Sequence, residues 1–191
     1  MRFPIAVLVA LSILPACLAP RVDASRYFTL SAVGTPSGGT PFASVGLGPV
    51  TLPSYLSRPE VATRLGPEQI AYSANDRWAG PLEDLAIQAL SEELRARLPA
   101  REVLRWPWPL GAPPEVGVSV EFLRFESDAA GGATLQARWT VSARGRAPVN
   151  GETRVREAGA PGDVPGSVAA LGRALGALAS DLAVAARAPG G

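Results

Sequence analysis

The side chains most often used for catalysis at neutral pH are missing from this sequence. It has no histidine, and all 18 basic residues are arginine, so it has no lysine either. This excludes Ser–His–Asp and Cys–His arrangements, the usual zinc ligand, a phosphate-loop lysine and a Schiff base. Two carboxyl groups facing each other across a cleft would remain available, but no acidic pair stands out from solvated surface charge. We therefore expect a protein that is not an enzyme and that uses no metal and no cofactor.

The one cysteine carries the clearest chemical signal. Cys17 follows a positive residue, Arg2, and an apolar run over residues 3–14. That run is about a dozen residues long, whereas a membrane-spanning helix needs about 20, so it is typical of a signal peptide. The segment LPAC at residues 14–17 matches the bacterial lipobox. We predict a signal peptide over residues 1–16 and acylation of Cys17; the alternative is a chance cysteine near an ordinary signal-peptidase site.

Processing would leave a lipidated cysteine and a short tether at residues 17–24. The eight residues 18–25 span at most about 26–29 Å, so the domain stays close to its membrane. Several acyl chains, each methylene contributing about 0.8 kcal/mol, would hold it there stably. Because Leu18 and not an aspartate follows the cysteine, a host with two membranes is expected to place the protein in the outer one, facing the periplasm.

The mature chain carries almost no net charge. Without Arg2 it has 17 basic and 17 acidic residues. A neutral surface has no electrostatic attraction for phosphates, so nucleic acid is not expected as a partner.

Residues 25–188 are expected to form one α/β (α+β) domain, a mostly antiparallel sheet covered by two main helices. Turn composition at residues 130–132 predicts a hairpin, and residues 53–64 are expected to be turn-like. Pro49 indicates a sheet edge or a bulge. Strands are predicted from alternation and β-branched or aromatic content at residues 25–33, 43–52, 69–73, 115–125, 134–142 and 151–156.

The first helix is expected to start from an N-cap at Asn75 or Asp76, to hold Pro81 in its first turn and to end at Pro99. Apolar residues at spacings of three and four give it one buried face: Ile87, Leu90, Leu94 and Leu98. Its charged residues are expected to lie mostly away from that face: Glu92, Glu93, Arg95 and Arg97.

The last helix is predicted at about residues 164–187. Its apolar positions keep spacings of three and four, and small residues surround them. We expect it to pack on the domain's own sheet; the alternative is that its small-residue face docks a neighbouring subunit.

Two further segments are either structural corners or docking sites. One is VTLPSYLSRPEV at residues 50–61, stiffened by prolines; the other is RWAGPL at residues 77–82. As corners, they would place Tyr55 at the core edge, Arg58 beside a carboxylate and Trp78 in the core, with Arg77 pairing nearby. As docking sites for a partner or an adjacent copy, they would use Pro53, Tyr55, Leu56, Arg58, Pro59, Arg77 and Trp78.

A third segment, RWPWP at residues 105–109, offers the same choice. Pro107 removes a ladder donor between Trp106 and Trp108, so at least one of these indoles is expected to be exposed. The segment is either a plain strand end or a partner site, because exposed tryptophan is enriched at interfaces.

With the lipobox, the YFTL strand at residues 27–30 and the later strand pair, these segments resemble the PqiC family. Its members are auxiliary lipoproteins of ABC-type and MCE-type transport systems. The resemblance implies a periplasmic α/β domain anchored in the outer membrane. It also implies an MCE protein as partner, which carries lipid or other hydrophobic cargo between the membranes, and a homo-oligomer by analogy.

Three functions remain open on the sequence. The first is a non-catalytic accessory of an MCE transport assembly. The second is a stand-alone lipid-binding module of the envelope, which predicts an apolar pocket between the first helix and the sheet. The third is a carboxylate-dependent hydrolase, which requires two acidic residues converging in a cleft.

Overall fold

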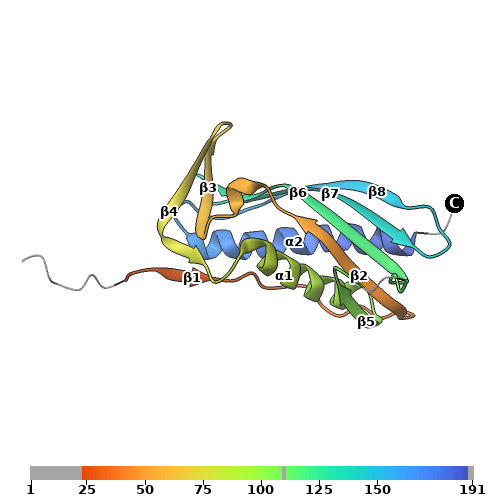
Figure 1. The fold of residues 1–191 in the computed structure, drawn as a ribbon. Helices are drawn as coiled ribbons and strands as arrows, with labels where there is room; N and C mark the ends of the chain where they lie inside the picture. Colours follow the sequence, from red (N-terminus) through yellow and green to blue (C-terminus); the bar gives the residue numbers. More distant parts are fainter. Residues whose placement is uncertain (1–22, 109–110, 189–191) are drawn as a thin grey trace, which may run out of the picture.

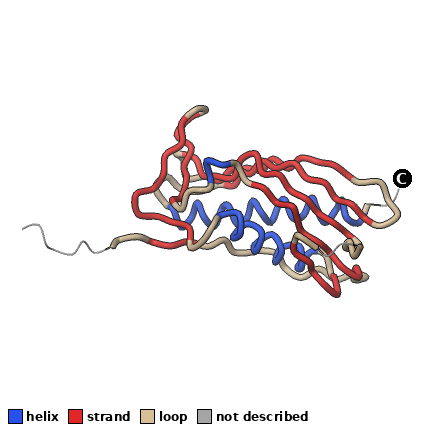
Figure 2. Tube along the Cα trace, viewed as in Figure 1, coloured by secondary structure: helices blue, strands red, loops and turns tan. Residues whose placement is uncertain are grey.

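The computed structural model describes residues 23–108 and 111–188, so the predicted signal peptide and Cys17 lie outside the described residues. The chain forms an eight-stranded mixed sheet with both long helices on one face (Figures 1 and 2), which confirms the predicted single α+β domain. The elements are β1 (Arg26–Phe28), β2 (Phe42–Thr51), β3 (Glu60–Gly66), β4 (Gln69–Trp78), α1 (Leu82–Arg97), β5 (Ala100–Arg105), β6 (Val116–Asp128), β7 (Ala133–Ala143), β8 (Val149–Glu157) and α2 (Val164–Arg187).

Strand β6 is the centre of the sheet because three strands pair with it, β2, β3 and β7. Along one edge it pairs antiparallel with β7, which pairs antiparallel with β8; these are the longest pairings of the sheet and confirm the predicted hairpin. The other edge is shared by two strands. Strand β2 runs parallel to the first half of β6, and β3 pairs in parallel only with Ser127 and Asp128. The chain between β2 and β3 therefore stays on this edge of β6 and lies beside the point where the partner of β6 changes.

The prediction that Pro49 marks an edge or a bulge is half confirmed. Strand β2 is no edge, because it pairs with β5 on one side and β6 on the other. The register with β6 slips between Leu47 and Val50, so Pro49 sits in a bulge. There its missing N–H donor removes no ladder bond.

Helix α1 begins later than predicted. Asn75 and Asp76 belong to β4, and the helix starts at Leu82 after Pro81. Asp76 does not cap a helix because its carboxylate accepts hydrogen bonds from the Arg26 Nε at 2.6 Å and the Ser73 hydroxyl at 2.7 Å. Acidic residues still occupy the first turn and arginines the last, as the helix dipole favours.

The prediction that Glu93 points away from the core was wrong. It is fully buried, as are Leu90, Leu94 and Leu98 on the expected apolar face, whereas Glu92 is exposed as predicted. Glu93 is buried because the chain crosses α1 on that side. Its carboxylate accepts hydrogen bonds from the backbone N–H groups of Val33 and Gly34 and from Arg97.

Residues 30–41, here called the strap, explain this burial. The sequence predicted a strand over residues 25–33, but only Arg26–Phe28 pairs, in parallel with β4. The strap then follows α2: a Cβ added to Gly172 would lie 2.8 Å from the Ser31 carbonyl oxygen, and one added to Gly176 would lie 3.0 Å from Val33. The small-residue face of α2 is thus covered by the chain's own strap, which removes it as a surface for a neighbouring subunit.

Helix α2 has the predicted bounds, and the Asp163 side chain caps it by accepting from Gly166 N–H. It is long and apolar enough to cross a membrane by composition alone, with a mean hydropathy of 1.5. In the domain it is a core helix, because 67% of that apolar window is buried. Its buried leucines lie between the sheet and the strap, and the predicted packing on the domain's own sheet is confirmed.

Two strands were missed on the sequence. Residues 53–64, expected to be turn-like, hold a 3₁₀ turn (Ser54–Leu56) and β3, which continues through a hairpin into a longer β4 than predicted. Strand β5 was not predicted because its residues alternate weakly and stay half-buried or exposed. Strand β5 pairs in parallel with the distant β2, whereas β3 pairs mainly with the adjacent β4 and reaches β6 through two residues only.

Candidate functional site

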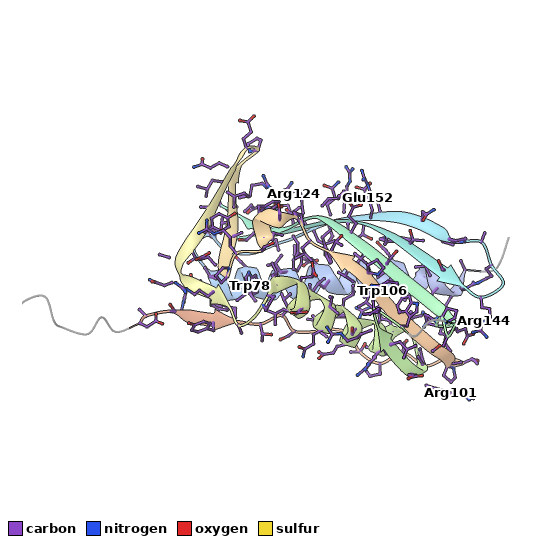
Figure 3. All side chains as sticks on the ribbon, viewed as in Figure 1. Trp78, Arg101, Trp106, Arg124, Arg144 and Glu152 are labelled. Carbon is purple, nitrogen blue, oxygen red and sulfur yellow. The ribbon has the colours of Figure 1, made fainter. Side chains whose placement is uncertain are left out.

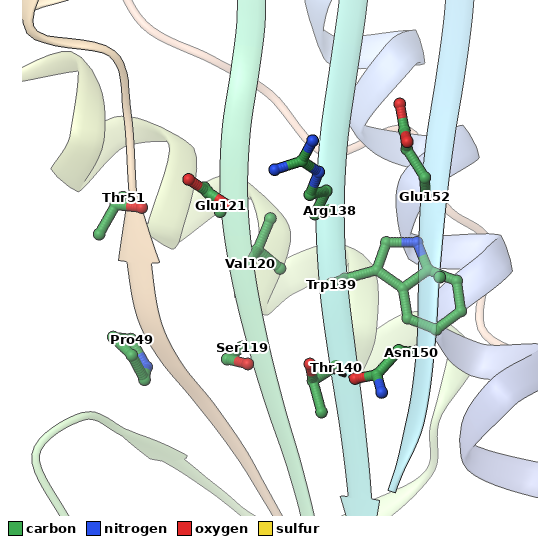
Figure 4. A pocket seen from close by; sticks show the side chains of 11 residues that line it. Pro49, Thr51, Ser119, Val120, Glu121, Arg138, Trp139, Thr140, Asn150 and Glu152 are labelled. Atoms are coloured by element: carbon green, nitrogen blue, oxygen red, sulfur yellow. Dashed lines mark hydrogen bonds between the residues drawn. The ribbon is translucent and has the colours of Figure 1, made fainter.

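The face of the sheet that points away from α1 and α2, here called the open face, is hollowed at its middle. Val116, Val118 and Val120 of β6 are buried toward the helices, so the residues between them point to the open face. A hollow of about 640 Å³ lies there across β2, β6, β7 and β8 (Figure 4). Its polar lining includes Thr51, Ser119, Glu121, Arg138, Thr140, Asn150 and Glu152.

Charges of both signs cross this hollow in one row. Arg138 is in register with Glu121 on one neighbouring strand and Glu152 on the other (Figure 4). Glu152 accepts hydrogen bonds from Arg154 at 2.6 Å and from Gln136 at 2.8 Å, and these hold the pKa of its carboxyl below the usual value. A general acid of the glycosidase kind needs a raised pKa. The Glu152 carboxylate therefore suits binding and not proton donation to a leaving group.

The Trp106–Trp108 segment forms one wall of the open face. The two indoles meet edge to face with centroids 4.8 Å apart, and 52% of Trp106 is exposed. Trp108 lies over a glycine of β2: a Cβ on Gly46 would come within 2.8 Å of its ring and 2.5 Å of Pro114. The expectation that at least one of these tryptophans is exposed is confirmed. Figure 3 shows Trp106 on the side of β2 and β5.

The 3₁₀ turn Ser54–Leu56 borders the open face where β6 changes partner. Leu56 is buried in the core, Tyr55 is half-buried, and the Tyr55 carbonyl accepts a hydrogen bond from the Tyr72 hydroxyl at 2.9 Å. The turn is closed by the Leu56 N–H, which donates to the Pro53 carbonyl at 2.9 Å. Pro59 also holds this segment to the sheet, because its carbonyl accepts a hydrogen bond from the Trp78 N–H at 2.7 Å.

A buried carboxylate, Glu126, fixes this turn to the sheet. The Glu126 carboxylate has no exposed surface and accepts hydrogen bonds from Arg64 at 2.7 Å, Tyr55 at 2.8 Å and Arg124 at 2.9 Å. Burial alone would raise the pKa of Glu126, but these three donors together hold it below its usual value. Burial and the neighbouring carboxylate raise the pKa of Tyr55 to about 12, so its hydroxyl remains a donor.

Arg58 is the exposed member of the predicted docking segment. Its side chain is 57% exposed, pairs with Glu60 at 3.2 Å and stacks over the Tyr72 ring with 4.3 Å to the ring centre. The carboxylate partner is the one expected for a structural corner. The guanidinium still presents part of its surface to solvent, so Arg58 is both a corner residue and an accessible one.

Arg77 and Trp78 lie apart from the hollow. Trp78 is buried in the core as predicted. Arg77 is in register with Glu60 on β3 and Tyr27 on β1. Its Nε is buried and has no hydrogen-bond partner among the described residues. The structure therefore brings Tyr55, Trp106 and Trp108 to the open face but leaves the RWAGPL segment at the β1 end.

Neither the charged row nor Glu126 was predicted from the sequence. The period-two pattern predicts the wet face that holds Glu121 and Arg138, but the predicted turn does not pair them, because the bulge between Phe122 and Arg124 shifts the register. Glu126 offered no such signal. It follows Phe125 directly, and its donors Tyr55 and Arg64 come from a segment 71 and 62 residues earlier in the chain.

Comparisons with known proteins agree with this fold. The family model for the ABC-type transport auxiliary lipoprotein component matches residues 28–183. Among solved structures, an uncharacterised protein matches with TM-score 0.68 and 18% identity, covering 83% of this chain and 96% of its own. A Xanthomonas campestris protein of the DUF330 family matches with TM-score 0.66 and 17% identity, covering 82% and 92%. No curated protein matches the sequence.

Proposed function

Because this chain belongs to the family of ABC-type transport auxiliary lipoprotein components, we propose that it is a non-catalytic accessory of an MCE-type transport system, anchored in the outer membrane through Cys17. The domain would stand in the periplasm and dock an MCE protein that carries lipid or another hydrophobic cargo between the membranes. The signal peptide over residues 1–16 and the tether at 17–24 supply the anchor in this proposal.

The open face carries the docking part of the proposal. Two of the segments singled out on the sequence border it, the 3₁₀ turn with Tyr55 and the Trp106–Trp108 pair, with a charged hollow near them. Tryptophan and arginine are enriched at protein interfaces and among the residues that contribute most to the binding energy. The hollow lies on the opposite side of the sheet from α1, and a row of three charged side chains crosses it, Glu121, Arg138 and Glu152, which favours a protein partner over a lipid.

Replacing Cys17 with serine tests the anchor. The change removes the thiol that would be acylated, and we expect the precursor to lose lipid labelling and the mature domain to leave the membrane fraction. The measurement is incorporation of labelled palmitate, followed by separation of inner and outer membranes. Membrane association of the serine variant equal to that of the parent would contradict lipid anchoring at this residue.

Replacing Trp106 with alanine tests the docking face. Truncating an exposed tryptophan at the centre of an interface costs 2 kcal/mol or more, so we expect about thirtyfold weaker capture of the co-encoded MCE protein. The measurement is a pull-down and a titration with the mature chain. The Tyr27→Ala variant is the control, because Tyr27 is also an exposed aromatic residue, 61% exposed, but lies on β1. Equal loss in both variants, or capture of no MCE protein by the parent, would count against this face.

A further inference from the structure

Unpaired arginines gather at one end of the domain. Among the described arginines, nine form an ion pair with a carboxylate within 4.0 Å. Seven of the described arginines form none with a described residue, and five of these line two adjoining hollows that share Pro41. We call this group the basic end; it consists of Arg95, Arg101, Arg144, Arg146 and Arg187.

The two hollows combine this charge with an apolar surface. The larger, about 540 Å³, includes Pro41, Phe42 and Val116; the smaller, about 360 Å³, includes Pro99 and Val103. Glu115 is the one acidic residue among the described residues that line them. Since the mature chain as a whole is neutral, this excess of positive charge is local. It suits a ligand that carries carboxylates or phosphates beside apolar groups.

Two of the five arginines of the basic end already donate hydrogen bonds to backbone carbonyls. Arg146 donates to the carbonyls of Ala186 and Ala188, and Arg187 donates to the Arg97 carbonyl, so these two also cap the ends of α2 and α1. The described residues supply no side-chain partner to Arg95, Arg101 or Arg144. The charge available to a ligand therefore comes mainly from these three, two of which are labelled at the same end of the molecule in Figure 3, Arg101 and Arg144.

The basic end lies far from the end that leads to the proposed anchor. Strand β1 lies near the start of α2 (Figure 1), and Arg187 is at its end. The 24 residues of α2 separate the two by about 36 Å, which exceeds the 26–29 Å reach of the tether. The tether is therefore too short for the basic end to rest end-on against its own membrane. A periplasmic protein is thus the better placed source of the anionic group.

We propose that the basic end is a second contact surface, which binds an acidic segment with interspersed apolar side chains on a soluble protein partner. Carboxylates of the segment pair with Arg101 and Arg144, and its apolar side chains enter the hollow over Phe42. This contact is separate from the open face and extends the proposed function.

The test uses the mature chain and a fluorescein-labelled peptide of glutamate and phenylalanine, followed by fluorescence anisotropy. We expect saturable binding that weakens as salt is added, and about tenfold weaker binding by the double variant Arg101→Glu, Arg144→Glu. The matched control is the double variant Arg105→Glu, Arg173→Glu, which changes the net charge equally at arginines outside the basic end whose side chains are 60% and 43% exposed. It should bind within about twofold of the parent.

Three results would overturn the proposal. Equal loss in the control variant would mean that only net charge matters. Equal binding of a peptide with lysine in place of glutamate would remove the electrostatic basis. Binding to phosphatidylglycerol vesicles but not to the peptide, with no binding to phosphatidylcholine vesicles, would make the basic end a lipid-headgroup surface instead.

Discussion

Replacing Glu93 with glutamine is expected to lower the free energy of unfolding by about 3–5 kcal/mol. The carboxylate is fully buried and binds Arg97 together with the backbone N–H groups of Val33 and Gly34, the latter at 3.1 Å. The amide keeps the shape but removes the charge. It leaves a guanidinium that is only 20% exposed without its counter-ion, and such broken pairs are costly because desolvation of the remaining charge is not repaid.

Urea denaturation of parent and variant measures this loss, and hydrogen exchange at Val33 and Gly34 reports whether the strap loosens. Glu92→Gln is the matched control, since it makes the same change one residue earlier on the exposed side of α1. We expect that control to remain within about 0.5 kcal/mol of the parent. If both variants lost the same stability, or if the strap amides stayed equally protected in Glu93→Gln, the strap would not depend on this carboxylate.

Replacing Glu126 with glutamine is expected to have a cost of similar size, about 3–5 kcal/mol, because it leaves Arg64 and Arg124 without their shared carboxylate. The effect should depend on pH. The pKa of Glu126 is lowered in the folded state, so its contribution is complete above the ordinary value of 4.5 and is lost as the pH falls through the lower, folded value. The difference in the free energy of unfolding between the parent and the Glu126→Gln variant should therefore become smaller at acidic pH.

Denaturation curves at about pH 7 and about pH 3 measure this narrowing. Glu121→Gln serves as the control, since Glu121 lies on the same strand but is exposed. This variant should change the free energy of unfolding little at either pH. If the parent and Glu126→Gln differed in the free energy of unfolding by the same amount at both pH values, the shape of the side chain and not its charge would account for the lost stability. Weaker MCE capture by Glu126→Gln, with Tyr55 still folded in place, would in addition link the turn to docking.

Prediction from the sequence succeeded where one face of an element is apolar and its period is clear. The bounds of α2 and the β6–β7 hairpin were found this way, because leucines at helical spacing and valines alternating with polar residues specify which side is buried. The expected burial of Trp78 and exposure of a tryptophan at 106 or 108 also followed from local chemistry.

The wrong predictions have one cause in common: the residue or strand that determines the local structure lies far away in the sequence. Asp76 looked like a helix cap, yet it binds Arg26, 50 residues earlier. Glu93 looked solvated, yet strap amides 60 and 59 residues earlier cover it. Strand β5, with weak alternation, forms because β2 offers it an edge. Local propensity carries no information about such pairings, so of the candidate site only the wet face of the hairpin strands and the exposed tryptophan could be predicted.

The path of the strap determines how the domain would respond to mechanical load. Tension applied through Cys17 would enter at β1 and run lengthwise along the strap toward β2, with the β1–β4 hydrogen bonds and the Glu93 contacts oriented across the pull. Bonds loaded in shear share the force and must break together, whereas bonds at a peeled edge break one after another. With the proposed anchor at Cys17, the domain would therefore resist tension from the envelope while its sheet stays paired.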